Sequence, residues 1–429
     1  MRRITSKKCR MGLLALSLVT GVLASWANAA EPALKAGDFV AVCGDSITEQ
    51  KQYSVFIEDY LLMCRPVANT RTMQFGWSGD TAGGFVQDKL TNDVLRFHPT
   101  VMTTCYGMND GRYGPLLPEV AKWYRESTQT LVDMAKQGNV RTLIIGSPGV
   151  VDSTSFRKDP AAAKVYNETL ASLSDIAKEV AEKNGVIFAN VHQPMMDAMA
   201  KAKAKYGDSY DLAGGDGVHP GANGHLVMAY AFLKAMGCDG ALGTITVDLS
   251  TGKATTTDGH QVISSAPGTV EIESSRYPFC FNGKPEDPNA TSGVIEFFPF
   301  NEDLNRFTLV VTNPSADKLK VTWGKVSKEF TKTDLAKGIN LAAEFLDNPF
   351  SAQFMKVHNA VAAQQNFETM FIKNFIFNIP AYASFTSEEN KPALELLAAD
   401  GGKKAKTLFD STASLVTPVR HTITVEAVK

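Results

Sequence analysis

A serine, an aspartate and a histidine in this sequence could together carry out acyl transfer. Ser46 stands at a Gly-Asp-Ser turn after a short apolar run. Its hydroxyl is a weak nucleophile until a neighbouring base takes the proton. His219 can be that base, and Asp216, which precedes it by three residues, can orient the imidazole ring and stabilise its charged form. We therefore expect Ser46, Asp216 and His219 to act as a catalytic triad.

The same chemistry needs hydrogen-bond donors for the negatively charged oxygen of a tetrahedral intermediate. Three groups are candidates: the backbone N–H of Ser46, the backbone N–H of Gly79 and the side-chain amide of Asn109. Because Gly79 has no side chain, a ligand can approach its N–H closely. We expect these three donors to form an oxyanion hole.

The elements around these residues must bring them together, and the first half of the chain has the pattern of a parallel β-sheet with helices on both faces. Apolar runs typical of buried strands alternate with segments of helical spacing, which predicts an α/β fold. The strand-like runs span residues 39–43, 70–75, 100–106, 141–146 and 186–191. Ligands bind at the carboxyl ends of the strands in such sheets, and Ser46, Gly79 and Asn109 each follow one of these runs.

Four stretches of the sequence, taken in order, resemble the four blocks that define the SGNH, or GDSL, hydrolase superfamily. They are Gly44-Asp45-Ser46, Gly79 within residues 77–81, Gly107–Asp110 and Asp216–His219. The resemblance covers residues 38–240. It implies a flavodoxin-like three-layer α/β/α domain and a serine esterase, a carboxylic ester hydrolase that needs neither a metal nor a cofactor. The four blocks contain the triad and the oxyanion donors named above.

Three further residues lie on loops at the same edge of the predicted sheet and are candidates for substrate binding. Trp77 could stack on a sugar or an acyl group, and Arg112 could hold an anionic substrate. Tyr113 is the third candidate.

The N-terminal segment is typical of a secretory signal peptide. Basic residues without an acid precede an apolar run from Met11 to Ala24, and Ala27-Asn28-Ala29 then offers a cleavage site. We expect residues 1–29 to be a signal peptide cleaved after Ala29, and the protein to be secreted or periplasmic. An uncleaved N-terminal anchor is the alternative. No other apolar run is long enough to span the bilayer, so no stable membrane span is expected after cleavage.

Charge and cysteine spacing exclude other classes of function. The formal net charge is -2, which gives no basic surface for nucleic acid. The cysteine spacing matches no zinc or iron–sulfur pattern. Cys64 could pair with Cys238 or Cys280 in an oxidising compartment, and the sequence does not decide this.

The pattern changes near residue 240, where alternating strand-like segments begin. They predict a β-sandwich with antiparallel strands, so we expect a hydrolase domain over residues 30–240 and a β-rich domain over 241–429. A helical insert is expected at about 332–378, packed on the sandwich or on the first domain, or closing the site as a lid. A short helix and a loop rich in Gly and Lys are expected over 388–406.

Export and the attached β-rich domain favour a small-molecule or polysaccharide ester as substrate, in particular short acyl (acetyl) esters on carbohydrate. A lipid acylhydrolase or thioesterase of the same mechanism is an alternative. Acyl transfer to an acceptor other than water, or a non-catalytic carbohydrate-binding protein, would also fit the pattern. The sequence does not indicate the oligomeric state.

Overall fold

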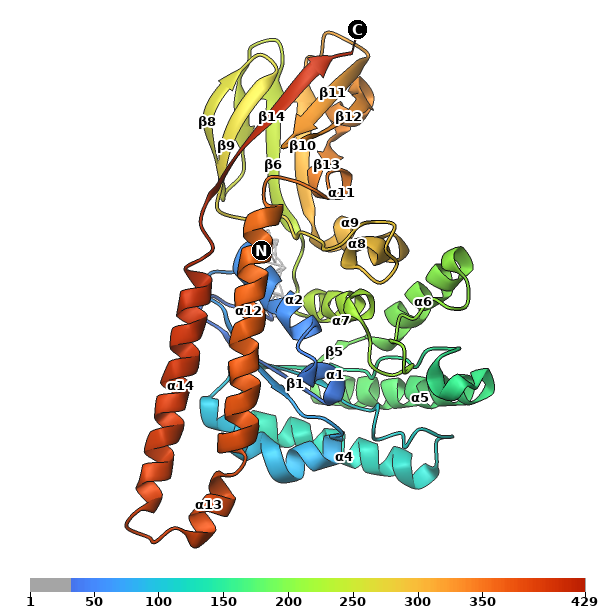
Figure 1. Cartoon of the computed structure of the whole chain (residues 1–429), viewed down its shortest axis with the longest axis vertical. Coiled ribbons are helices and arrows are strands. Elements are labelled where there is room, and N and C mark those ends of the chain that lie inside the picture. Colours follow the sequence, from blue (N-terminus) through green and yellow to red (C-terminus); the bar gives the residue numbers. More distant parts are fainter. Residues whose placement is uncertain (1–31, 429) are drawn as a thin grey trace, which may run out of the picture. The chain divides into compact units, whose positions relative to one another are not determined.

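Parallel strands form the sheet of the first half of the chain (Figure 1). The structure is a computed structural model that describes residues 32–428, so the expected signal peptide lies outside the described residues. The strands are β1 (Phe39–Gly44), β2 (Arg71–Gly76), β3 (Val101–Cys105), β4 (Thr142–Gly146) and β5 (Ile187–Ala189). Their order is β2-β1-β3-β4-β5, with every neighbouring pair parallel. This is the doubly wound order of flavodoxin-like folds.

Helices cover both faces of this sheet, because successive side chains of a strand point to opposite faces. Val40 and Val42 of β1 pack into one core with α2 (Tyr53–Asp59) and α7 (Ala222–Ala235), whereas Ala41 and Cys43 pack into another with α4 (Pro118–Gln137) and α5 (Pro160–Asn184). The helices are α1 (Ser46–Glu49), α2 (Tyr53–Asp59), α3 (Ala82–Gly84), α4 (Pro118–Gln137), α5 (Pro160–Asn184), α6 (His192–Tyr206) and α7 (Ala222–Ala235), with π-helical segments at Tyr60–Cys64 and Phe85–Val94. The predicted three-layer α/β/α fold is confirmed.

The second half of the chain forms two packed β-sheets, as predicted for a β-sandwich. One sheet has the order β13-β10-β6-β7 and the other β12-β11-β14-β9-β8. The strands are β6 (Ala241–Asp248), β7 (Ala254–Thr256), β8 (His260–Ala266), β9 (Thr269–Ser274), β10 (Arg306–Thr312), β11 (Lys318–Trp323), β12 (Val326–Thr331), β13 (Ile339–Asn340) and β14 (Val419–Ala427). The rings of Phe307 on β10 and Trp323 on β11 are both buried, with their centres 5.7 Å apart, in the core between the sheets.

One strand pair of the sandwich departs from the expected antiparallel pattern. Strands β6 and β10 run parallel to each other. A parallel pair needs a long crossover connection, and here the intervening chain supplies it. That chain includes β8 and β9 of the other sheet and two short helices, α8 (Thr291–Val294) and α9 (Phe300–Leu304).

Two long helices, which we call the helical arm (residues 351–413), interrupt the sandwich before its last strand (Figure 1). The arm consists of α12 (Ser351–Phe371), a π-helical turn (Ile372–Ile376), α13 (Ile379–Phe385) and α14 (Lys391–Ala413). It extends well beyond the expected bound of 378. The residues expected to form a Gly- and Lys-rich loop are instead part of helix α14. Gly401 allows this helix to pack closely on Phe371, because a side chain at position 401 would collide with the Phe371 ring.

The start of the expected insert is different as well. Residues 332–344 form α10 (Lys332–Lys337), strand β13 and α11 (Leu341–Glu344) rather than one continuous helix. Gly338 separates α10 from the strand, with a φ of +99° that glycine adopts readily. This stretch therefore belongs to the edge of the sandwich.

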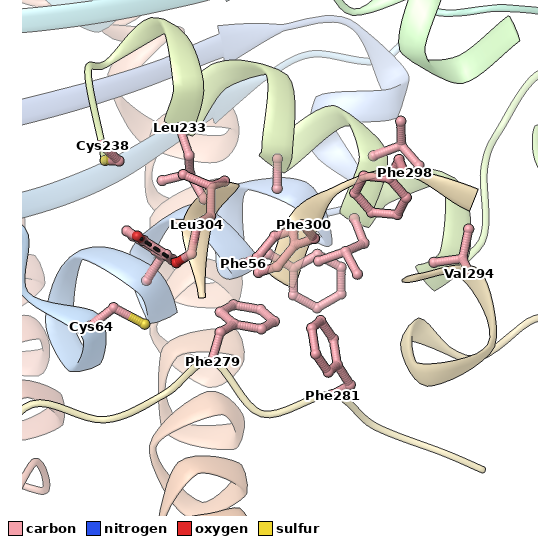
Figure 2. Packing of buried hydrophobic residues seen from close by; sticks show 14 of the residues in the cluster. Phe56, Cys64, Leu233, Cys238, Phe279, Phe281, Val294, Phe298, Phe300 and Leu304 are labelled. Carbon is pink, nitrogen blue, oxygen red and sulfur yellow. Dashed lines mark hydrogen bonds between the residues drawn. The ribbon is translucent and has the colours of Figure 1, made fainter. Parts of the chain in front are cut away.

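The α/β part, the sandwich and the arm share one continuous core. Figure 2 shows the part of this core around Phe279. The ring of Phe279 lies at the centre of their junction. Its centre is 6.3 Å from that of Phe56 on α2 and 5.0 Å from that of Phe300 on α9. It is also 5.0 Å from that of Phe354 on α12. Ala33–Lys429 accordingly forms one compact unit.

Two expectations about the environment of the protein can be compared with the described residues. The cysteines from Cys43 onwards are buried free thiols, so Cys64 pairs with neither Cys238 nor Cys280 in this structure. Burial raises the pKa of the Cys238 and Cys280 thiols to about 12. Across residues 32–428, none of the helices combines the length and the apolar composition of a membrane span.

Candidate active site

Ser46 lies at the carboxyl end of β1, in a tight turn between the strand and a helix. It is the first residue of α1, and the Asp45 side chain caps this helix by accepting the Ile47 N–H at 3.0 Å. A Cβ atom at Gly44 would lie 2.0 Å from Thr48 Oγ1 and 2.9 Å from the Cys105 carbonyl oxygen. Glycine is therefore required where α1 folds back on the sheet.

The structure places the three residues of the expected triad in hydrogen-bond contact. Ser46 Oγ lies 2.8 Å from His219 Nε2, and His219 Nδ1 lies 2.7 Å from Asp216 Oδ2. The other oxygen of Asp216 accepts the N–H groups of Val218 and His219, both at 2.9 Å. Burial alone would raise the pKa of Asp216, but these N–H groups and the His219 ring outweigh it and lower the pKa. Asp216 is therefore held as a carboxylate facing the ring.

A neighbouring loop holds the segment that carries Asp216 and His219. The Asp152 N–H donates to the Gly217 carbonyl at 2.8 Å, and Asp152 itself is buried against Lys203 at 3.2 Å. A Cβ atom at Gly217, where φ is +79°, would collide with the backbone of Phe156. Both contacts fix the loop of residues 216–219 against the rest of the α/β part.

The expected oxyanion donors also lie at the carboxyl edge of the sheet. Within residues 32–428, neither the Ser46 N–H nor the Gly79 N–H has a hydrogen-bond acceptor. Gly79 has a φ of +74°, in the left-handed region that favours glycine. Both N–H groups are thus unused by the described part of the chain.

Asn109 is oriented by two hydrogen bonds. Its Nδ2 donates to the Asp80 carbonyl at 2.8 Å, and its Oδ1 accepts from the Tyr113 hydroxyl at 2.7 Å. Because a side-chain amide carries two N–H hydrogens, one remains for a ligand.

Buried carboxyl groups tie the loops of the site together. Asp110 Oδ1 accepts the Ala82 N–H at 3.0 Å, and Oδ2 accepts the Gly107 N–H at 2.9 Å. Burial raises the pKa of Asp110 to about 7, and burial with nearby carboxylates does the same for Asp45. These side chains are engaged with the backbone rather than open to a ligand. Within the described residues, no group of three or more His, Cys, Asp or Glu side chains lies together in a way that could hold a metal ion.

The three expected substrate-binding residues have different surroundings. Arg112 is exposed. Tyr113 stacks on Tyr166, with ring centres 5.1 Å apart, and its hydroxyl binds Asn109. The Trp77 ring packs on Phe377 of the helical arm at 4.4 Å. Tyr113 and Trp77 therefore already have partners in the protein.

Two residues next to the site were missed by the sequence reasoning. Glu49 accepts the Ser78 N–H at 2.5 Å and binds Lys373 of the arm at 2.7 Å. Glu49 could have been suspected, since it lies one helical turn after Ser46. No local pattern marks Lys373, which is separated from Glu49 by 324 positions.

The doubly wound sheet, with a serine in contact with a histidine at its carboxyl edge, defines an α/β/α protein of a hydrolase type. Residues 42–227 match the model of the GDSL-like lipase/acylhydrolase family. Lipases and acylhydrolases cleave esters, so the protein is a carboxylic ester hydrolase. No curated protein matches the chain.

Several solved structures are similar to the whole chain or to part of it. A gut microbial diltiazem-metabolizing enzyme is 23% identical over 92% of this chain and 98% of its own, with a TM-score of 0.70. An alpha/beta hydrolase from the metagenome of Lake Arreo, Spain, is 24% identical over 48% of this chain and 98% of its own, with a TM-score of 0.40. An acetylxylan esterase from Geobacillus stearothermophilus is 22% identical over 47% of this chain and 95% of its own, with a TM-score of 0.38.

Proposed function

We propose that this ester hydrolase is a serine esterase in which Ser46, His219 and Asp216 form the catalytic triad. The observation that carries the proposal is the continuous hydrogen-bonded line from Ser46 Oγ through the His219 ring to Asp216, with distances of 2.8 and 2.7 Å. Such a line is what a serine needs in order to lose its proton during attack.

The proposed reaction has two halves. Ser46 Oγ attacks the ester carbonyl carbon while His219 Nε2 takes the hydroxyl proton, and His219 then donates that proton to the departing alcohol. In the second half, His219 takes a proton from a water molecule as its oxygen attacks the acyl carbon. His219 then donates that proton to Ser46 Oγ as the bond between Oγ and the acyl carbon breaks, which releases the carboxylic acid and restores the free serine. Asp216 stabilises the charged imidazole ring in both halves.

The negative charge that develops on the carbonyl oxygen would be stabilised by the Ser46 N–H, the Gly79 N–H and the free N–H of Asn109. Support comes from the two backbone N–H groups, which have no acceptor within residues 32–428. Donors held in advance at such positions typically contribute about a hundredfold or more each to the rate.

The proposed substrates are short acyl esters, such as acetyl esters, on carbohydrate outside the cytoplasm. The side chains of His219 and Asp216 are 35% and 58% exposed, so the reacting edge is open and has room for a bulky polar alcohol. The signal-like N-terminal segment supports the location, and the attached sandwich supports a large substrate.

Hydrolysis of p-nitrophenyl esters by the full chain and its Ser46→Ala variant tests the proposal. We expect p-nitrophenyl acetate to be cleaved faster than octanoate, and Ser46→Ala to lose activity by on the order of 10⁴-fold or more. Ser411→Ala, on the exposed face of α14, is the matched control and should behave like the unchanged protein. Equal rates in the Ser46→Ala variant would overturn the triad, and a preference for octanoate would overturn the acetyl ester assignment.

A further inference from the structure

The helical arm covers the edge of the catalytic sheet that carries the Gly79 turn (residues 77–80). Helix α12 packs along β2, which is the edge strand (Figure 1). The Gln74 N–H on this edge donates to Glu368 of α12 at 3.0 Å, and the Thr369 hydroxyl donates to the Gln74 side chain at 3.2 Å. The arm thus supplies the partner that an edge strand lacks.

From this edge the arm reaches the helix of the nucleophile. Gln74 Nε2 donates to the Thr48 carbonyl at 2.9 Å, which joins β2 to α1. Five residues beyond Glu368, Lys373 Nζ lies 2.7 Å from Glu49 Oε1, and Glu49 is the last residue of α1. The arm is therefore bonded both to β2, which leads into the Gly79 turn, and to α1, which begins at Ser46.

Glu49 carries this contact into the Gly79 turn. Its second oxygen, Oε2, accepts the Ser78 N–H at 2.5 Å, and Ser78 directly precedes Gly79. One carboxylate thus joins the arm to the peptide next to an oxyanion donor. The Lys373 and Glu49 side chains are 27% and 22% exposed, so the pair is shielded from water more than an ordinary surface pair.

A second contact holds the same turn from the side of Trp77. Its ring packs on Phe377 of the arm at 4.4 Å, and Lys373 Nζ lies 4.8 Å from the ring centre. Cations over an aromatic face are attracted to it. Lys373 therefore contacts both Trp77, the first residue of the turn, and Glu49, which binds the second residue.

We propose that Lys373 is a positioning residue for ester hydrolysis, which acts through Glu49 to hold the Gly79 turn and its N–H in place. This inference rests on the proposed function, since it takes Gly79 to be an oxyanion donor. Two physical reasons support it. A donor must lie within about 2.7–3.1 Å of the oxyanion to be effective, and Gly79 has no side chain to fix its backbone. Lys373 also neutralises Glu49, whose charge would oppose a developing oxyanion nearby.

Steady-state kinetics with p-nitrophenyl acetate test the role of Lys373. In Lys373→Met we expect kcat to fall about tenfold, because small displacements of a catalytic donor are costly, with KM nearly unchanged. The rate of labelling by a fluorophosphonate, which also develops negative charge on oxygen, should fall in parallel. Lys373→Arg keeps the charge and should restore most of the activity. Lys403→Met is the matched control, since Lys403 is an exposed lysine of α14 that pairs with Asp400 on the same helix.

The double variant Lys373→Met/Glu49→Gln shows whether Lys373 acts through Glu49. If it does, the two changes are not additive, and the double variant is no slower than Lys373→Met alone. Additive losses would overturn the route through Glu49. If Lys373→Met fails to fold, Lys373→Gln and Glu49→Gln carry the same test, with thermal unfolding measured on each.

The outcomes separate this inference from the proposed function. Full kcat in Lys373→Met, beside an inactive Ser46→Ala variant, would overturn the positioning role and leave the triad standing. An active Ser46→Ala variant would overturn the triad itself. A rise in KM with unchanged kcat would contradict positioning of a transition-state donor, because only uniform binding would then have been lost.

Discussion

The two sides of the candidate active site are held by different kinds of contact. On the histidine side, Asp216 and His219 are three residues apart, and the backbone between them supplies two of the hydrogen bonds that fix the carboxylate. On the other side, which carries the expected oxyanion donors and is called the oxyanion side below, Glu49 holds the Gly79 turn. Lys373 of the arm, far away in the sequence, binds Glu49 in turn. A short motif can specify the first side by itself, whereas the second depends on the whole fold.

The largest effect is expected where the local side is broken. Asp216→Asn should lower kcat by on the order of 10³- to 10⁴-fold, because the amide favours the wrong tautomer of His219 and cannot stabilise its charge. Its oxygen can still accept the two backbone N–H groups, so thermal unfolding should change little. Asp175→Asn, an exposed change on α5, serves as control. A loss below tenfold would mean that Asp216 does not orient the histidine.

A smaller effect is expected on the oxyanion side, where Tyr113 orients Asn109. Tyr113→Phe removes the hydroxyl that donates to Asn109 Oδ1 but leaves the stack on Tyr166. We expect kcat to fall several-fold, compared with about a hundredfold in Asn109→Ala, which removes a donor altogether. Equal losses in the two variants would show that Tyr113 has a direct role, as substrate contact or otherwise.

The smallest effect concerns stability, at the contact between the arm and the sheet. Burial raises the pKa of Glu368, and burial raises that of the neighbouring Glu58 to about 7. With the folded pKa above the unfolded one, the native state binds more protons, so the free energy of unfolding falls as pH rises from about 4 to 7. Glu368→Gln should make this decline shallower, as measured by urea unfolding at pH 5 and pH 8.

The exposed change Glu388→Gln should leave that pH dependence as it is, since Glu388 lies at the surface. An unchanged slope in Glu368→Gln would show that this carboxyl is not protonated in the folded protein.

The sequence was sufficient for the sheet, because buried strands and helices leave periodic patterns. It was insufficient for the arm. The low helix propensity of Gly401 favours a loop. In the fold, however, Gly401 lies within α14 and allows this helix to pack closely on α12. The parallel pairing of β6 and β10 has no local signal either, since strand direction in a sandwich is set by connections elsewhere.

The same limit applies to the site. Residue types and spacing predicted that Ser46, Asp216 and His219 lie together, and the structure brings their side chains into hydrogen-bond contact. The partners of Trp77 could not be predicted, because Phe377 and Lys373 reach it only through the packing of α12 on β2. An aromatic residue on a loop near a site has no pattern that separates a ligand contact from an internal one.

The position of the arm between β13 and β14 has a consequence for biosynthesis. During translation Ser46, Asp216 and His219 emerge from the ribosome long before Lys373, and β14, in the middle of its sheet, emerges after the arm. A nascent polypeptide would therefore contain these three residues while the flank of β2 is still uncovered. Synthesis of the arm would then cover that flank and bring Lys373 to Glu49 in the same step.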